Sequence, residues 1–178
     1  MQKVREALAT NPTIDTDRAV ALGTSNGGGM VLQLAGRTEI FSAVAAVRTH
    51  LVCGWEPNTH KRPVPILQIS TQDDPLVPYV GGQSPVRHRF YPAEQSTQIW
   101  ASDNRCASSA TQRTTDEGST VLTCDRCRDN TRVHYWEIDI EKHQILNNTE
   151  GGIQELIFEF FGLEQQLTTK SSDTIQPP

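Results

Sequence analysis

The sequence has 178 residues, of which 36% are hydrophobic and 21% charged, and its formal net charge is −5. That length suffices to bury one core. The mildly acidic balance gives no indication of the basic stripe that nucleic-acid binding requires, and no apolar run is long enough to cross a bilayer.

Predicted strands and helices alternate along the chain. A helix is expected over residues 2–10, and the short apolar run at 18–22 predicts a buried strand. Apolar residues at helical spacing over 30–35 predict the next helix. Further strands are expected at 41–47, 64–70 and 133–139, and further helices at 91–101 and 153–161. This order predicts one α/β domain over residues 1–163 with a mostly parallel sheet, followed by a disordered tail over 164–178.

The first predicted strand ends in a Gly-x-Ser-x-Gly pattern at Gly23-Thr24-Ser25-Asn26-Gly27. A sharp turn from strand to helix at such a pattern presents the serine hydroxyl as a nucleophile. Ser25 is therefore the predicted nucleophile, and the backbone N–H of Asn26 is the predicted oxyanion donor. The competing interpretation is an ordinary glycine-rich or phosphate-binding turn, although the Gly-Lys-Ser/Thr ending of a Walker loop is absent.

An acid and a base are expected to follow later strands. Asp73 and Asp74 come directly after the strand at 64–70, at the sheet edge where ligands of parallel sheets bind. His143 follows the last predicted strand, so the candidates occur in the order serine, aspartate, histidine. His134 is the rival base, but it lies inside a strand where its side chain is expected to pack against a helix. The three remaining histidines lie in loops without the required order: His50, His60 and His88.

The four cysteines are Cys53, Cys106, Cys124 and Cys127. The CxxC spacing of Cys124 and Cys127 is compatible with a redox pair or half of a zinc site. We favour a disulfide from Cys106 to either Cys124 or Cys127, stapling a polar, turn-rich segment. The sequence gives no sign of a cofactor, and metal binding is the weaker interpretation.

Three stretches resemble one known family: Leu22 to Met30, Arg62 to Leu67, and Asp74 to Tyr79. They look like the extracellular polyhydroxybutyrate depolymerase and feruloyl esterase-like family of α/β-hydrolases. The resemblance implies Ser25 as nucleophile, Asp74 rather than Asp73 as the triad acid, and His143 as base. It also implies a secreted protein that cleaves carboxylic esters, with an ester substrate that can be polymeric, although residues 1–8 lack the features of an export signal.

In an α/β-hydrolase, several strands precede the nucleophile strand, whereas here only one predicted helix precedes Ser25. We therefore expect the chain to be the carboxyl-terminal part of the fold, lacking the amino-terminal strands and the second oxyanion donor. Two alternatives to an esterase stay open. One is a serine peptidase of the prolyl-oligopeptidase type, and the other is a truncated, non-catalytic remnant that only binds a ligand.

Overall fold

The computed structural model describes residues 2–58, 62–107, 110–115, 119–138 and 152–163. The chain divides into two compact units, residues 1–145 and residues 146–178. The described part of the second unit is helix α4 (Ile153–Phe161), which ends at Gly162 in the left-handed conformation, with φ of 67°. The tail expected over 164–178 lies outside the described residues. None of the described helices is long and apolar enough to span a membrane.

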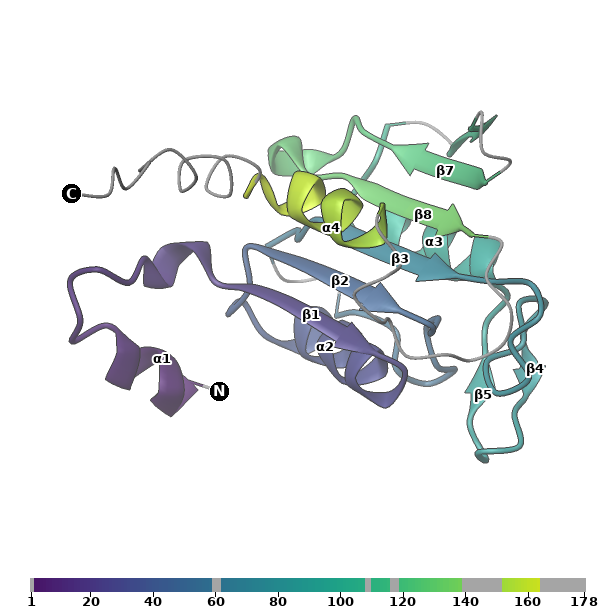
Figure 1. The fold of residues 1–178 in the computed structure, drawn as a ribbon, viewed down its shortest axis with the longest axis horizontal. Coiled ribbons are helices and arrows are strands. Elements are labelled where there is room, and N and C mark those ends of the chain that lie inside the picture. The colour runs from purple at the N-terminus through teal and green to yellow at the C-terminus, as the bar shows by residue number, and fades with distance from the viewer. Residues whose placement is uncertain (1, 59–61, 108–109, 116–118, 139–151, 164–178) are drawn as a thin grey trace, which may run out of the picture. The chain divides into compact units, whose positions relative to one another are not determined.

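The first unit is built around a sheet with the strand order β1-β2-β3-β8-β7-β6 in the described residues. Its parallel strands are β1 (Val20–Thr24), β2 (Ala43–Val47), β3 (Ile66–Ser70) and β8 (Val133–Glu137). Their arrowheads point the same way in Figure 1. The prediction of an α/β fold with a mostly parallel sheet is confirmed, because all four apolar runs form neighbouring parallel strands.

Within the described part of the first unit, two helices pack on the sheet. Helix α2 (Asn26–Arg37) contacts β1 and β2, and helix α3 (Ala93–Asp103) contacts β7 and β8. Leu32 of α2 and Trp100 of α3 belong to one buried cluster with side chains of β2 and β3, so the two helices share a face of the sheet. All residues of β2 and β3 are buried, as expected for central parallel strands. Two further helical segments precede the sheet: α1 (Gln2–Leu8) and the 3-10 turn Thr16–Arg18.

Two hairpins were not predicted from the sequence. β4 (Gly82–Gln83) and β5 (Arg89–Phe90) form a small antiparallel pair beyond the carboxyl ends of the parallel strands (Figure 1). β6 (Thr111–Thr114) and β7 (Thr120–Cys124) extend the main sheet in antiparallel fashion from β8. The segment that we expected to be a turn-rich excursion is therefore largely sheet. All four residues of β6 are exposed, so this strand lacks the apolar alternation by which a sequence shows a strand.

A disulfide joins Cys106, which follows α3, to Cys127, which precedes the 3-10 turn Arg128–Asn130. The loop closed by this disulfide therefore contains the β6–β7 hairpin. Cys53 and Cys124 are free thiols.

Cys106→Ser is expected to lower the free energy of unfolding by about 3 kcal/mol, because the bridge closes a loop with a sequence separation of 21. Urea unfolding with and without a reductant measures this loss. Cys53→Ser is the matched control, and it should change stability by less than about 0.5 kcal/mol. An equal loss in both variants would contradict a stabilising role for the bridge.

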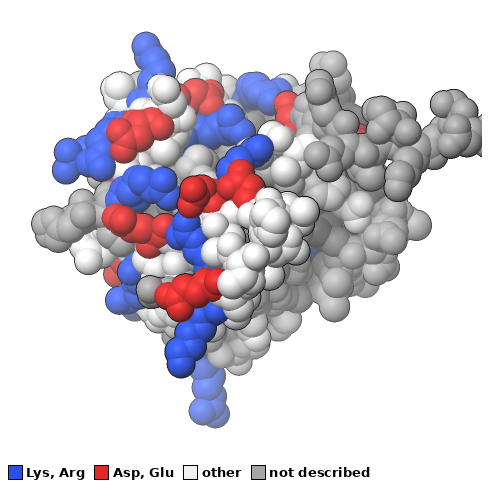
Figure 2. Space-filling model, turned by 90° about the vertical axis from the view of Figure 1, so that its left-hand side faces the viewer, with Lys and Arg blue, Asp and Glu red and all other residues white. Residues whose placement is uncertain are grey.

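Charged side chains of both signs lie close together on the face of the molecule shown in Figure 2. Blue and red atoms alternate there. Among the described residues on that face, the charges of the two signs are mixed rather than gathered into a surface of one sign.

The candidate active site

The parallel register brings the ends of four strands to one edge of the sheet. Thr24 pairs with Val47, Val47 with Ile69, and Ile69 with Trp136. The residue after each of these therefore lies in the next row, which contains Ser25, Arg48, Ser70 and Glu137. Ligands of parallel sheets bind at this carboxyl edge. The predicted nucleophile and the loop with the predicted acid both start there.

Ser25 forms the turn between β1 and α2. Its φ of 53° and ψ of −120° lie in a region that residues other than glycine rarely adopt. Hydrogen bonds fix this backbone: Ser25 N–H donates to the Val47 carbonyl at 2.8 Å, and Gly29 N–H donates to the Ser25 carbonyl at 3.0 Å. A strained serine between a strand and a helix is the geometry of a nucleophile elbow.

Glycines allow the close approach of backbone segments that this turn requires. A Cβ on Gly23 would lie 2.2 Å from the Gly27 carbonyl oxygen. A Cβ on Gly28 would lie 2.6 Å from Thr49 Cγ2. At Gly27 itself an added Cβ would meet no atom within 4 Å. Of the two glycines in the Gly-x-Ser-x-Gly pattern, only the first is thus required by packing.

Gly23→Ala is expected to lower stability by about 3 kcal/mol and to disrupt the turn, because the new methyl group meets backbone atoms that cannot move aside independently. Gly27→Ala is the matched control. It adds the same methyl group in open space within α2 and should be neutral or stabilising by up to about 1 kcal/mol. Thermal unfolding of both variants tests this difference. Equal tolerance of both substitutions would contradict the described turn.

The Asp74 carboxylate is buried, with 4% exposure, in the loop after β3. Its Oδ1 accepts hydrogen bonds from the backbone N–H groups of Leu76 and Val77, at 2.8 and 2.9 Å. Asp73, by contrast, is exposed. The resemblance singled out Asp74, and the structure adds that Asp74 is the carboxylate of this pair that the loop encloses and orients.

Of the other predicted site residues, the structure describes some and not others. Asn26 begins α2, where backbone N–H groups have no partner within the helix, and its role as oxyanion donor stays a prediction. His143 and His60 lie outside the described residues. His134 lies within β8 as predicted, and its Nε2 lies 2.5 Å from Asp125 Oδ1.

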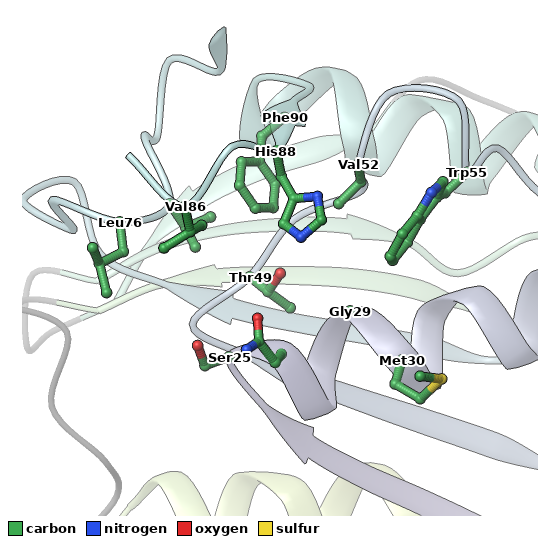
Figure 3. Close-up of a pocket in the computed structure, with 12 residues that line it drawn as sticks. Ser25, Gly29, Met30, Thr49, Val52, Trp55, Leu76, Val86, His88 and Phe90 are labelled. Carbon is green, nitrogen blue, oxygen red and sulfur yellow. The ribbon is translucent and has the colours of Figure 1, made fainter. Parts of the chain in front are cut away.

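A cavity of about 310 Å³ opens beside Ser25 (Figure 3). Ser25, Gly29 and Met30 line one side of it, and Val52 and Trp55 line another. The rest of the lining comes from Asn26, Thr49 and the segment from β3 to β5, namely Leu76, Val77, Val86, His88 and Phe90. The volume is at the lower end of the range for small-molecule sites, and the mostly apolar lining suits an uncharged, apolar group.

Backbone hydrogen bonds join the two segments that line the cavity opposite Ser25, residues 51–55 and residues 86–91. Cys53 N–H donates to the Arg89 carbonyl at 2.8 Å, and Tyr91 N–H donates to the Leu51 carbonyl at 3.0 Å. Trp55 packs edge to face on His88, with ring centroids 5.7 Å apart. These contacts connect the segments that line the cavity on this side.

The sequence did not identify His88 or Trp55 as site residues. Their signal is weak because both lie in irregular segments, and only the unpredicted pairing of β4 with β5 and the bridge between Val52 and Phe90 bring them near Ser25. His50 is a second unexpected case, since this loop histidine is fully buried. Among the described residues, no group of three or more His, Cys, Asp or Glu side chains is arranged to hold a metal ion.

The strained serine between β1 and α2, at the carboxyl edge of a mostly parallel sheet and beside an apolar cavity, is characteristic of a serine hydrolase of the α/β-hydrolase type. Comparison with known proteins supports this class. The model of the prolyl oligopeptidase family matches residues 1–53. No curated protein matches the chain.

The family match covers the segment from α1 to the loop after β2, which includes the Ser25 turn, and ends before Asp74. It supports the α/β-hydrolase part of the resemblance drawn from the sequence. It gives no support to polyhydroxybutyrate depolymerases or feruloyl esterases in particular.

Proposed function

We propose that the protein hydrolyses carboxylic esters through an acyl-enzyme formed on Ser25. The observation that carries this proposal is the strained backbone of Ser25 beside an apolar cavity. The nucleophile would attack an ester carbonyl while the cavity holds one apolar portion of the substrate.

The proposed mechanism uses Ser25, His143 and Asp74. His143 takes the proton from the Ser25 hydroxyl as its oxygen attacks the ester carbonyl, and Asp74 orients the imidazole. The Asn26 N–H stabilises the oxyanion of the tetrahedral intermediate. His143 then gives its proton to the departing alcohol. Water, deprotonated by the same imidazole, attacks the acyl-enzyme and releases the carboxylic acid and free Ser25.

The proposed substrates are esters with an apolar, uncharged acyl or alcohol portion, of the polyhydroxyalkanoate or the feruloyl and acetyl type. The lining by Trp55, Phe90 and aliphatic side chains supports an apolar portion. We also propose that the protein is secreted. The disulfide between Cys106 and Cys127 supports this localisation, because disulfides persist mainly in oxidising compartments.

A serine peptidase of the prolyl oligopeptidase type is the second candidate, because the model of that family matches residues 1–53. A peptidase would use the same three residues, with an amine in place of the alcohol as leaving group. The apolar cavity beside Ser25 would accept the proline ring equally well. Geometry at the nucleophile therefore does not separate the two functions, whereas substrates do.

The experiment compares p-nitrophenyl butyrate with a blocked Gly-Pro p-nitroanilide, both of which release a chromophore. Each kcat/KM is divided by the rate constant of uncatalysed hydrolysis, so that the greater intrinsic reactivity of the ester does not decide the result. We expect the larger enhancement for the ester. A larger enhancement for the anilide would overturn the esterase proposal in favour of the peptidase.

A further inference from the structure

A buried cluster of hydrogen-bonded side chains lies at the same sheet edge and has no part in the proposed reaction. His50 Nε2 lies 2.7 Å from Ser70 Oγ, and Ser70 Oγ lies 2.7 Å from the Tyr135 hydroxyl. His50 and Tyr135 are fully buried, and Ser70 is 1% exposed. The three residues come from the loop after β2, the end of β3 and the middle of β8. We call them the buried triad.

Burial disfavours the charged forms of the two outer members of the buried triad, His50 and Tyr135. Burial lowers the pKa of His50 to about 4, and burial also raises the pKa of Tyr135. The His50 ring packs edge to face on Tyr79 and on Tyr135, at centroid distances of 6.4 and 6.2 Å. Hydrogen bonds in such a dry setting are strong and directional, so the triad fixes the relative positions of the segments that carry it.

Those segments lead to the proposed acid and base. Ser70 is the last residue of β3, and the Asp74 loop starts directly after it. The Ser70 carbonyl accepts a hydrogen bond from the backbone N–H of Ile138 at 2.9 Å, and Ile138 is the residue that follows β8. In the sequence, His143 follows this point. The negative charge of Asp74 also acts on the pKa of His50, in the direction opposite to burial.

We propose that His50, Ser70 and Tyr135 are positioning residues, which fix the ends of β3 and β8 so that the Asp74 loop keeps the orientation needed for hydrolysis. This inference rests on the proposed function. The triad does not touch substrate in this account. It acts through the loop, where small displacements of catalytic groups have large effects on rate.

The test uses Ser70→Ala, which removes the central hydroxyl, and Tyr135→Phe, which removes one outer hydroxyl. Thr97→Val is the matched control, because the Thr97 hydroxyl is also fully buried and bonded, to the Ala93 carbonyl within α3 at 3.0 Å. For each variant, kcat and KM for p-nitrophenyl butyrate are measured, together with hydrogen exchange of the Leu76 and Val77 amides that bind Asp74.

We expect Ser70→Ala to lower kcat by about tenfold to a hundredfold with little change in KM. The Leu76 and Val77 amides should exchange about tenfold faster, since a looser loop opens more often. Tyr135→Phe should change both quantities in the same direction by less, and Thr97→Val should change neither. Unchanged exchange in Ser70→Ala, or equal changes in Thr97→Val, would overturn the inference. A wild-type protein without hydrolytic activity would contradict the proposed function instead, and the exchange comparison would still decide whether the triad positions the loop.

Discussion

Ser25→Ala is expected to reduce kcat for ester hydrolysis by about 10⁶-fold, because the acyl-enzyme cannot form without the hydroxyl. The fold should be retained. Alanine has fewer atoms than serine, and the hydrogen bonds that fix this turn are made by backbone groups. At the positive φ of 53°, alanine and serine have similar backbone strain, so the substitution adds little. Kinetics with p-nitrophenyl butyrate, with circular dichroism as a check on folding, measure the effect.

Ser42→Ala is the matched control for this experiment. Ser42 lies near the opposite end of β1, where its hydroxyl donates to the Ala19 carbonyl at 3.1 Å. This substitution should leave kcat within about twofold and cost no more than about 1 kcal/mol of stability. A Ser25→Ala protein that retains more than a small fraction of wild-type activity would mean that another group is the nucleophile.

Asp74→Asn carries the second-largest expected effect, a loss of about 10⁴-fold in kcat. An amide cannot stabilise the imidazolium that forms during the reaction, and it favours the wrong tautomer of the histidine. The carbonyl oxygen of asparagine can still accept the hydrogen bonds from Leu76 and Val77, so the loop should keep its conformation. The expected loss is therefore electrostatic rather than structural, and it should appear in kcat more than in the melting temperature.

Asp73→Asn is the control, because Asp73 is the adjacent carboxylate and is exposed. We expect it to retain wild-type kcat within about twofold. If Asp73→Asn were the damaging substitution and Asp74→Asn the harmless one, the proposed acid would be wrong, although the Ser25 nucleophile would remain.

The sequence predicted the parts of the fold in which apolar patterning is strong. The runs at 18–22, 41–47 and 64–70 are apolar enough to show buried strands, and each forms part of the parallel sheet. The Gly-x-Ser-x-Gly pattern located the turn at Ser25 because the close backbone approach at Gly23 leaves no room for a side chain, so that a glycine is required there.

The β6 strand, the cavity and the burial of His50 could not be predicted from the sequence pattern. β6 is polar and fully exposed, so its pairing with β7 is decided by tertiary contacts rather than by its own residues. The cavity depends on the short pairing of β4 with β5 and on the bridge between Val52 and Phe90, which bring together residues distant in sequence. The sequence predicts only that His50 lies in a loop, because a single sequence does not show that this loop is buried beside Ser70.

The most direct test of the account is reaction of the purified protein with a fluorophosphonate probe, followed by mass spectrometry of its peptides. Only a serine activated by a neighbouring base reacts rapidly with such a probe. We expect a single phosphonyl adduct on Ser25, absent from Ser25→Ala and much slower to form in Asp74→Asn. A folded protein that gives no adduct, or an adduct on a different residue, would contradict the assignment of Ser25 as the nucleophile of a serine hydrolase.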